Sequence, residues 1–385
     1  MVKKLFPFLF IFGSFIGSFY YFLSYEEDAA KDIVLGASLP LSGINSDLGI
    51  EVSEGANTYF SHTNARGGVN GQKIKFIYYD DKYEPQNTLK NINTLLNKDK
   101  AFALFGFVGT PTVKKVMPIV IDSNIPMIAP YTGASFLRNT HIANIVNFRS
   151  SYSQEIETIV AYLTETKKFT KFSIFYQNDD FGEEGYVALV EALKKRGLKL
   201  HSEGTYKRNT LSIKHGLSEI SSTKPEAVII VGAYKPAARF IEKARNCCLE
   251  DTLFVPISFV NSDALVRELH KDGSHMLFSQ TVPSFNDESL QSAKEYLGLL
   301  GFYYPNSLPT HASFESFLAA KSVILALKKI EENINPQDFL RNLKNLETNA
   351  LQDIPLGFKN SQLLNQIYLL QYKDGKFQTI YKDKK

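Results

Sequence analysis

The chain has 385 residues, which exceeds one ordinary compact core and suits two domains of α/β size. Its 43 basic and 40 acidic residues leave a formal charge of +3, and the basic residues are dispersed along the chain. This balance predicts a solvated surface and argues against a nucleic-acid partner.

The first thirty residues predict an export signal. Lys3 and Lys4 precede an uncharged run over residues 5–24, and acidic residues follow at positions 26–28. The run is long enough to span a bilayer and no A-x-A site follows it, so a cleaved signal peptide and a retained signal anchor both stay open. In both cases the two lysines keep the amino terminus inside, so the body of the chain is expected outside the cytoplasm.

Residues 33–81 predict a strand, a loop, a helix, a turn and a second strand. The apolar strand Ile33–Leu39 ends at the loop Pro40-Leu41-Ser42-Gly43, and a helix follows from near Leu48 to Gly67-Gly68. The next strand spans residues 73–79. Loops after the strands of open α/β sheets are where ligands bind, so this loop is expected to face a ligand, and it is not a phosphate-binding loop.

The alternation of strands and helices continues in two series. Strands that alternate with helical segments need crossover connections, so each series predicts a doubly wound, mostly parallel sheet. The first series adds helices at 86–97 and 113–122 and strands at 101–106, 126–129 and 144–148. The second has helices at 151–166, 183–196, 211–221 and 235–246 and strands at 171–176, 198–206, 227–231 and 253–256.

The remaining segments predict how two lobes are joined. Residues 275–282 are expected to cross back to the first lobe, where the helix 310–329 packs. A third crossing near 348–352 leads to a hairpin around Asp374-Gly375. The predicted class is α/β, with two doubly wound lobes, mostly parallel central sheets and a three-stranded hinge. Residues 1–30 form the signal peptide or signal anchor, 31–148 and 280–349 lobe 1, and 149–279 and 350–385 lobe 2.

Four strings carry a resemblance to a known family. They are Asn147-Phe148-Arg149-Ser150-Ser151-Tyr152, Tyr176-Gln177-Asn178-Asp179-Asp180-Phe181-Gly182, Val231-Gly232-Ala233-Tyr234-Lys235-Pro236 and Ser258-Phe259-Val260-Asn261-Ser262. With the opening unit, they resemble type I periplasmic solute-binding proteins of the branched-chain amino-acid (Leu/Ile/Val)-binding family of ABC transporters. The resemblance implies a periplasmic protein, expected to be a monomer, that works with an ABC permease in the inner membrane.

The resemblance implies that the solute docks on lobe 1 through Thr110, Tyr131 and Gly133. Thr110 opens a helix, where free N–H groups and a hydroxyl bind a carboxylate, although the same residue could simply cap its helix. Tyr131 and Gly133 stand where relatives carry a methyl group and a hydroxyl, which predicts a different ligand shape; an ordinary surface turn is the alternative.

From lobe 2, the resemblance implies that Phe181, Tyr234 and Ser258 close over the solute. Either aromatic residue could instead pack against its adjoining helix. Relatives carry a Glu at the place of Ser258 to pair with an ammonium group, and a buried ammonium without a counter-charge costs several kcal/mol. Ser258 therefore predicts a solute other than a simple branched-chain amino acid, unless Asp179 or Asp180 supplies the charge instead of capping a helix.

The only two cysteines, Cys247 and Cys248, are adjacent near the end of a predicted helix. Neighbouring residues are poorly placed for an ordinary disulfide, so unpaired structural thiols are expected. No Cys follows the apolar run closely, which argues against a lipoprotein anchor.

Enzyme motifs are missing from the sequence. It has no HExxH, no Gly-rich phosphate loop before a helix and no G-x-S-x-G elbow, although a triad assembled in space stays open. We therefore expect no enzyme, no cofactor and no metal. The expected function is extracytoplasmic binding of a small carboxylate-bearing solute by closure of two lobes, with delivery to an ABC-type importer. The alternative is a membrane-anchored sensing ectodomain that works with a separate signalling partner.

Overall fold

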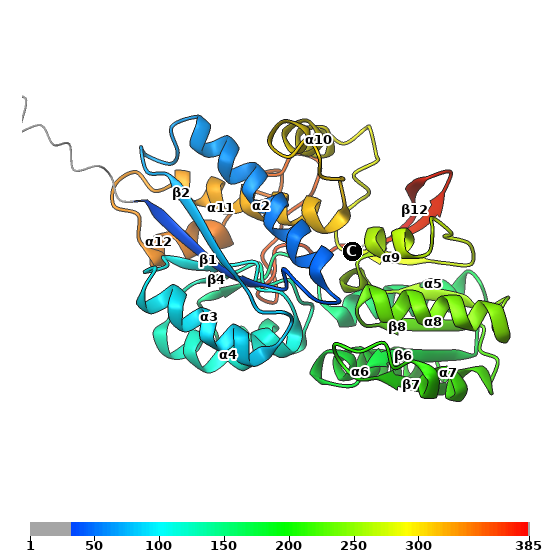
Figure 1. The fold of residues 1–385 in the computed structure, drawn as a ribbon. Helices are drawn as coiled ribbons and strands as arrows, with labels where there is room; N and C mark the ends of the chain where they lie inside the picture. The colour runs from blue at the N-terminus through cyan, green and yellow to red at the C-terminus, as the bar shows by residue number, and fades with distance from the viewer. Residues whose placement is uncertain (1–31, 384–385) are drawn as a thin grey trace, which may run out of the picture.

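The computed structural model describes residues 32–383, which form two α/β lobes side by side (Figure 1). The predicted signal segment, residues 1–30, lies outside the described residues. The predicted fold class is confirmed: each lobe has a parallel central sheet with helices packed on it. No helix within residues 32–383 is long and apolar enough to cross a membrane.

Lobe 1 is built on a five-stranded parallel sheet of order β2-β1-β3-β4-β5. Its strands are β1 (Ile33–Leu39), β2 (Ile74–Asp80), β3 (Ala103–Phe105), β4 (Met127–Ile128) and β5 (Ile145–Val146). Its helices are α2 (Ser46–Ala65), α3 (Pro85–Asn97), α4 (Thr110–Ser123), α10 (Gln291–Tyr303), α11 (His311–Lys328) and α12 (Pro336–Lys344). Helices α2 and α11 cover one face of the sheet and α3 and α4 the other (Figure 1).

Lobe 2 repeats this design with a four-stranded parallel sheet of order β7-β6-β8-β9. Its strands are β6 (Phe172–Gln177), β7 (Leu200–Tyr206), β8 (Ala227–Val231) and β9 (Leu253–Pro256). Its helices are α5 (Tyr152–Glu165), α6 (Asp180–Lys194), α7 (Lys214–Ser221), α8 (Tyr234–Cys247) and α9 (Ser262–Glu268). All five residues of β8 are buried, as expected of a parallel strand covered on both faces.

A small antiparallel sheet of β10 (Phe278–Gln280), β11 (Tyr368–Lys373) and β12 (Lys376–Lys382) belongs to lobe 2. The hairpin turn predicted at Asp374 and Gly375 is confirmed, and both residues have positive φ, 52° and 77°. Such a turn matches the twist of the two strands that it joins.

The chain crosses between the lobes three times. The residues before and after each crossing pack in different cores: Phe148 and Tyr152, Val282 and Phe278, Leu364 and Ile367. Leu351 and Ile354 also pack in the lobe 1 core, and the Leu363 amide donates to the Asn147 carbonyl oxygen at 3.0 Å. We propose that the third crossing follows Leu364, and that residues up to this point belong to lobe 1.

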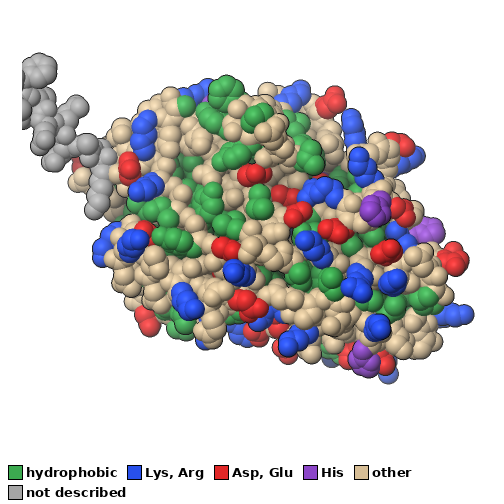
Figure 2. All heavy atoms as spheres, in the orientation of Figure 1, with side chains coloured by type: hydrophobic (Ala, Val, Ile, Leu, Met, Phe, Trp, Pro, Cys, Tyr) green, Lys and Arg blue, Asp and Glu red, His purple; other side chains and the backbone are tan. Residues whose placement is uncertain are grey.

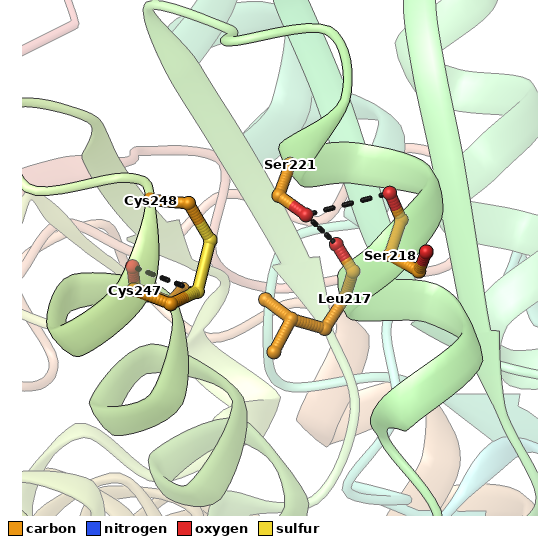
Figure 3. The surroundings of a disulfide bond; sticks show 6 residues. Leu217, Ser218, Ser221, Cys247 and Cys248 are labelled. Carbon is orange, nitrogen blue, oxygen red and sulfur yellow. Dashed lines mark hydrogen bonds between the residues drawn. A yellow bond between two sulfur atoms is a disulfide. The ribbon is translucent and has the colours of Figure 1, made fainter.

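Cys247 and Cys248 form a disulfide, which corrects the expectation of unpaired thiols (Figure 3). Cys247 is the last residue of α8, and Cys248 follows it with an extended φ of −166°. The helix therefore ends between the two residues, and the change of backbone direction brings the sulfur atoms together. Figure 3 shows the bridge beside Leu217, Ser218 and Ser221 of α7.

Charged side chains of both signs are interspersed over the face shown in Figure 2. No large area of a single sign covers this face, in agreement with the small net charge of +3. The surface in view therefore lacks the basic stripe that nucleic-acid binding would require.

Candidate ligand-binding cleft

The cleft lies where the carboxyl ends of the strands in the two lobes face each other. Lobe 1 contributes the loops after β1, β2, β3 and β4, and lobe 2 contributes the segments after β6, β8 and β9. Parallel sheets of this type bind ligands at these ends. The contacts described below join residues of the two lobes, so the structure is a closed form.

Thr110 is the first residue of α4 and is fully buried. The preceding position, Gly109, is the N-cap, and no side chain among the described residues caps this helix. The Thr110 hydroxyl instead lies 2.8 Å from the Thr132 hydroxyl in the loop after β4. The helix dipole and two hydroxyl groups thus meet at one point, an arrangement suited to an anion.

Two glycines in this region allow aromatic rings to pack directly against the backbone. Gly109 has a φ of 102°, and a Cβ there would lie 2.4 Å from the Tyr83 ring. A Cβ at Gly133 would lie 2.5 Å from the Tyr152 ring and 2.6 Å from its backbone nitrogen. Gly133 accepts a hydrogen bond of 2.9 Å from the Tyr152 amide, so its role in the structure is to receive the first crossing segment.

An aromatic cluster of Tyr83, Tyr131, Tyr152, Phe181 and Phe259 lies between the lobes. Each of these side chains is at most 4% exposed. Phe259 contacts the other four rings, with centroid distances of 4.5 Å to Phe181, 6.1 Å to Tyr131, 6.2 Å to Tyr83 and 6.5 Å to Tyr152. Because Tyr83 and Tyr131 belong to lobe 1 and Phe181 and Phe259 to lobe 2, this cluster packs only when the lobes are closed.

Ser258 lies beside the cluster, but its hydroxyl already has protein partners. It donates to Glu155 Oε1 at 2.8 Å and accepts from Arg149 Nη2 at 2.9 Å. Its amide also donates to Glu155 Oε2 at 2.9 Å. Ser258 thus joins the first crossing segment to α5 in this closed form, and its role as a ligand contact stays a prediction.

Arg149 is the central cation of the hinge. Its guanidinium is paired with Glu315 of α11 and stacks over the Tyr131 ring, with Cζ 4.0 Å from the ring centroid. Burial opposes the charge, but Glu315, Tyr131 and Glu155 together raise the pKa of Arg149 above its ordinary value. Burial raises the pKa of Glu155, against the opposing effect of Arg149.

Tyr234 lies in a separate contact between the lobes, the α2–α9 contact, formed by Asp47, Glu51, Tyr234, Asn261 and Arg267. The Tyr234 hydroxyl donates to Asp47 Oδ1 at 2.8 Å. Arg267 pairs with both Asp47 and Glu51, at 3.1 and 2.8 Å, and Asn261 donates to Glu51 at 2.8 Å. These bonds close one edge of the cleft.

The other edges of the cleft are also closed by polar contacts. Arg208 of lobe 2 pairs with Glu84 of lobe 1 at 3.3 Å and with Asp179 of its own lobe at 3.0 Å. Lys114 of α4 pairs with Asp180 of α6. Asp179 also accepts from the Phe181 amide at 3.1 Å, so the expectation that it caps the following helix is confirmed.

Several buried polar atoms of the cleft have no hydrogen-bond partner among the described residues. They are both side-chain atoms of Asn45, the hydroxyls of Tyr83 and Tyr152, and Arg149 Nη1. Burial raises the pKa of Tyr152 to about 12, against Arg149 and the nearby Thr132 and Thr110 hydroxyls, and raises that of Tyr83 well above its ordinary value. Both tyrosines are therefore neutral donors near neutral pH.

The structure brings Thr110, Tyr131, Gly133 and Phe181 together around the aromatic cluster, with Tyr234 and Ser258 at its borders. The sequence reasoning did not single out Tyr83, Arg149, Tyr152 or Phe259. Arg149, Tyr152 and Phe259 lie inside the strings that carried the family resemblance, so their positions were available as a signal. Tyr83 had no such signal. Within residues 32–383, no group of three or more His, Cys, Asp or Glu residues could hold a metal ion.

Comparison with known proteins gives the family. The sequence profile described as "Periplasmic binding protein" matches residues 32–376. An "Amino acid binding protein" of Pseudomonas aeruginosa is 26% identical over 57% of this chain and 58% of its own length. The "Leu/Ile/Val-binding protein homolog 7" of Brucella melitensis is 19% identical over 92% of each chain. The matches span about half the length of the first curated relatives, between 48% and 58%.

Solved structures show the same fold. A "possible leucine/isoleucine/valine-binding protein" from Rhodopirellula baltica is 27% identical and has a TM-score of 0.86, over 93% of this chain and 98% of that one. A "substrate-binding periplasmic protein" from Ralstonia solanacearum has a TM-score of 0.83 at 23% identity, over 90% of this chain and 100% of that one. The chain belongs to the periplasmic binding protein family, in its two-lobed type I form, as the sequence predicted.

Proposed function

We propose that the protein binds a small solute between its lobes, outside the cytoplasm, and delivers it to an ABC-type importer whose permease lies in the inner membrane. The observation that carries the proposal is the set of buried polar atoms without partners on Asn45, Tyr83, Arg149 and Tyr152. A buried polar atom left without a hydrogen bond costs about 1–3 kcal/mol, so folded proteins keep few of them. A solute held between the lobes supplies the missing partners.

The contacts between the lobes support a mechanism of closure. The aromatic cluster and the α2–α9 contact each need residues from both lobes, so both form only on closing. A solute that contacts both lobes shifts the equilibrium toward the closed form by its difference in affinity for the two forms. The closed shape is what a permease can distinguish from the open one.

The relatives support a binding role. Curated relatives from Escherichia coli and Brucella melitensis are named as Leu/Ile/Val-binding proteins or homologues of such proteins. Members of the family are binding proteins rather than enzymes, and we propose no catalytic activity for this chain. The comparisons do not favour the alternative of a sensing ectodomain.

We propose the periplasm as the location and a monomer as the state. Whether residues 5–24 are removed or retained as an anchor can be decided by the intact mass of the protein in the soluble and membrane fractions. A soluble species that starts after residue 24 supports cleavage, and a full-length species in the membrane fraction supports the anchor. Sedimentation of that species tests the monomer.

The proposed function is tested by native mass spectrometry on the full chain, purified in mild detergent, together with a thermal-shift panel of amino acids, organic acids, sugars and nucleosides. A solute that binds the folded state raises the melting temperature once its concentration exceeds the Kd. Thr110→Ala should weaken its binding about tenfold, since a hydrogen bond to a charged group contributes roughly 1.5–3 kcal/mol.

The matched control for this variant is Thr94→Ala. The Thr94 hydroxyl donates only to the Lys90 carbonyl oxygen within α3, so this variant should bind as the parent does. A chain that carries no small molecule and responds to none of the four solute classes contradicts solute binding.

A further inference from the structure

The polar groups that face the cleft without partners are dominated by donors. The unpartnered atoms of Tyr83, Tyr152 and Arg149 are two hydroxyls and one guanidinium nitrogen, all fully buried. The amino-terminal end of α4 lies in the same region, because the hydroxyls of Thr110 and Thr132 are near that of Tyr152. Three side-chain donors and the positive end of a helix dipole suit a ligand that accepts hydrogen bonds.

The buried carboxylates nearby are already engaged by the protein. Glu155 accepts two bonds from Ser258 and a third from the Ser279 hydroxyl at 2.7 Å. Glu315 accepts both bonds of its pair with Arg149, and its Oε2 also accepts from the Thr281 hydroxyl at 2.8 Å.

Relatives carry a glutamate at the place of Ser258, and the acidic residues that could replace its charge here also have protein partners. Asp179 caps α6 and pairs with Arg208, while Asp180 pairs with Lys114 at the surface. Asp81, in the loop after β2, accepts from the Ser38 hydroxyl at 2.7 Å and from the Tyr83 amide at 2.8 Å. None of these carboxylates is left to pair with an ammonium group on a ligand.

A second guanidinium, that of the half-buried Arg138, adds a positive charge near the cleft. Arg138 lies behind the loop that presents Thr132, and it donates to the carbonyl oxygens of Thr132, Ala134, Arg149 and Ser150 and to Gln362 Oε1. No carboxylate among residues 32–383 is within ion-pair distance of it. The two positive charges of Arg138 and Arg149 therefore match the two carboxylates Glu155 and Glu315. The amino-terminal end of the α4 dipole adds further positive potential. Burial lowers the pKa of Arg138 to about 9, which still leaves it charged at neutral pH.

The walls of the cleft are aromatic. The five rings of the aromatic cluster come from both lobes and are at most 4% exposed, so a solute bound against the cluster contacts flat apolar surfaces. Aromatic rings stack well on other flat groups and favour them over compact polar ones.

Resting on the proposed function, we propose that the solute is an organic carboxylate with a flat apolar body, most suitably an aromatic ring, and without a charged amine. Its carboxylate accepts from the hydroxyls of Thr110, Thr132 and Tyr152 at the start of α4. Its apolar body lies against Phe181 and Phe259. An ammonium group in the same place would be buried without a carboxylate partner.

The test compares ligands that share a carbon skeleton and differ in one group. One set is 3-phenylpropionate, phenylalanine and 3-phenylpropanamide; a second is phenylacetate, phenylglycine and phenylacetamide; a third, aliphatic set is 4-methylpentanoate, leucine and 4-methylpentanamide. Kd values are measured by titration calorimetry with the full chain in mild detergent. In at least one aromatic set, the plain carboxylate should bind about tenfold or more tightly than both the amino acid and the amide.

Each other outcome has a definite meaning. Equal or tighter binding of an amino acid overturns the absence of an amine, and equal binding of an amide overturns the anionic group. If the aliphatic carboxylate alone binds, the flat body is wrong. If another solute class binds while all nine compounds fail, the inference is wrong and the proposed function stands. If no solute of any class binds, both are wrong.

The site itself is tested with Tyr152→Phe and Tyr83→Phe. Each variant removes one hydroxyl that has no partner among the described residues, so the melting temperature without solute should stay unchanged. Tyr152→Phe should weaken the carboxylate about tenfold and leave the amide unaffected. Tyr186→Phe, at the partly exposed surface of α6, is the matched control. Unchanged carboxylate binding in Tyr152→Phe overturns this placement of the anion.

Discussion

Arg149 and Glu315 form a two-bond ion pair inside the hinge, with Nε to Oε1 at 2.9 Å and Nη2 to Oε2 at 3.0 Å. Their side chains are 1% and 4% exposed. Arg149 also donates to Ser258 of lobe 2, while Glu315 belongs to α11 of lobe 1. One guanidinium therefore links the first crossing segment to both lobes.

Removing the acidic partner should destabilise the fold strongly. Glu315→Gln leaves the Arg149 charge buried without its counter-charge, and such a loss costs about 3–5 kcal/mol. Urea unfolding followed by circular dichroism measures the change. Glu331→Gln, on an exposed residue, is the control and should stay within about 0.5 kcal/mol of the parent. A loss below about 1 kcal/mol in Glu315→Gln would show that the pair contributes little.

Tyr234→Phe should weaken solute binding by opening one edge of the cleft. The variant removes only the hydroxyl that donates to Asp47 Oδ1 at 2.8 Å. Asp47 is 38% exposed, so solvent reduces the value of this bond to about 1 kcal/mol, or about a fivefold higher Kd. Small-angle scattering should also show a larger open fraction at subsaturating solute. An unchanged Kd and unchanged scattering would mean that this bond does not contribute to closure.

Closure should be stronger at acidic pH because of Glu51. In the closed form the pKa of Glu51 is raised from 4.5 to about 7, chiefly by burial and also by Asp263, against the opposing effects of Arg267 and Asn261. Arg267 and Asn261 belong to lobe 2, so opening returns Glu51 to water and to its ordinary pKa. A group whose pKa is raised in the closed form favours that form at pH below 4.5, and the advantage is lost as pH rises through 7. The full effect is on the order of 3 kcal/mol.

The measurement is the Kd of a bound solute from pH 8 to pH 5. Affinity should increase as pH falls, and Glu51→Gln should remove most of the dependence. Asp263 and His311 form a buried pair on the same side of the cleft. His311→Asn is therefore measured in parallel, to separate any effect of this pair on the Kd from that of Glu51. A pH profile that is the same in Glu51→Gln and in the parent would rule out Glu51 as the source.

Reduction of the Cys247–Cys248 disulfide should have a small effect on stability. The bond closes a ring between adjacent residues, and the entropic stabilisation of so short a loop is about 1 kcal/mol. Intact mass should rise by two hydrogen atoms on reduction, and the Cys247→Ser and Cys248→Ser double variant should unfold within about 1 kcal/mol of the oxidised parent. Two thiols that react with a thiol probe before reduction would contradict the disulfide.

The sequence by itself determined the elements that depend on local chemistry. The run Ala227–Val231 was predicted with the bounds that β8 has, because a parallel strand buried on both faces needs a continuous apolar segment. The Asp374-Gly375 turn was predicted from residues that tolerate positive φ. Ser258 was recognised as a departure from the family, because a serine cannot neutralise an ammonium group.

Only the tertiary structure decided which side chains share a site. Ser258 meets Glu155 across 103 residues, and Arg149 meets Glu315 across 166, separations over which the sequence carries no pairing signal. The aromatic cluster depends on the closure of one lobe on the other, since its rings come from both. Pattern and turn chemistry act over a few residues, whereas burial, charge balance and unpartnered donors depend on the packing of the whole chain.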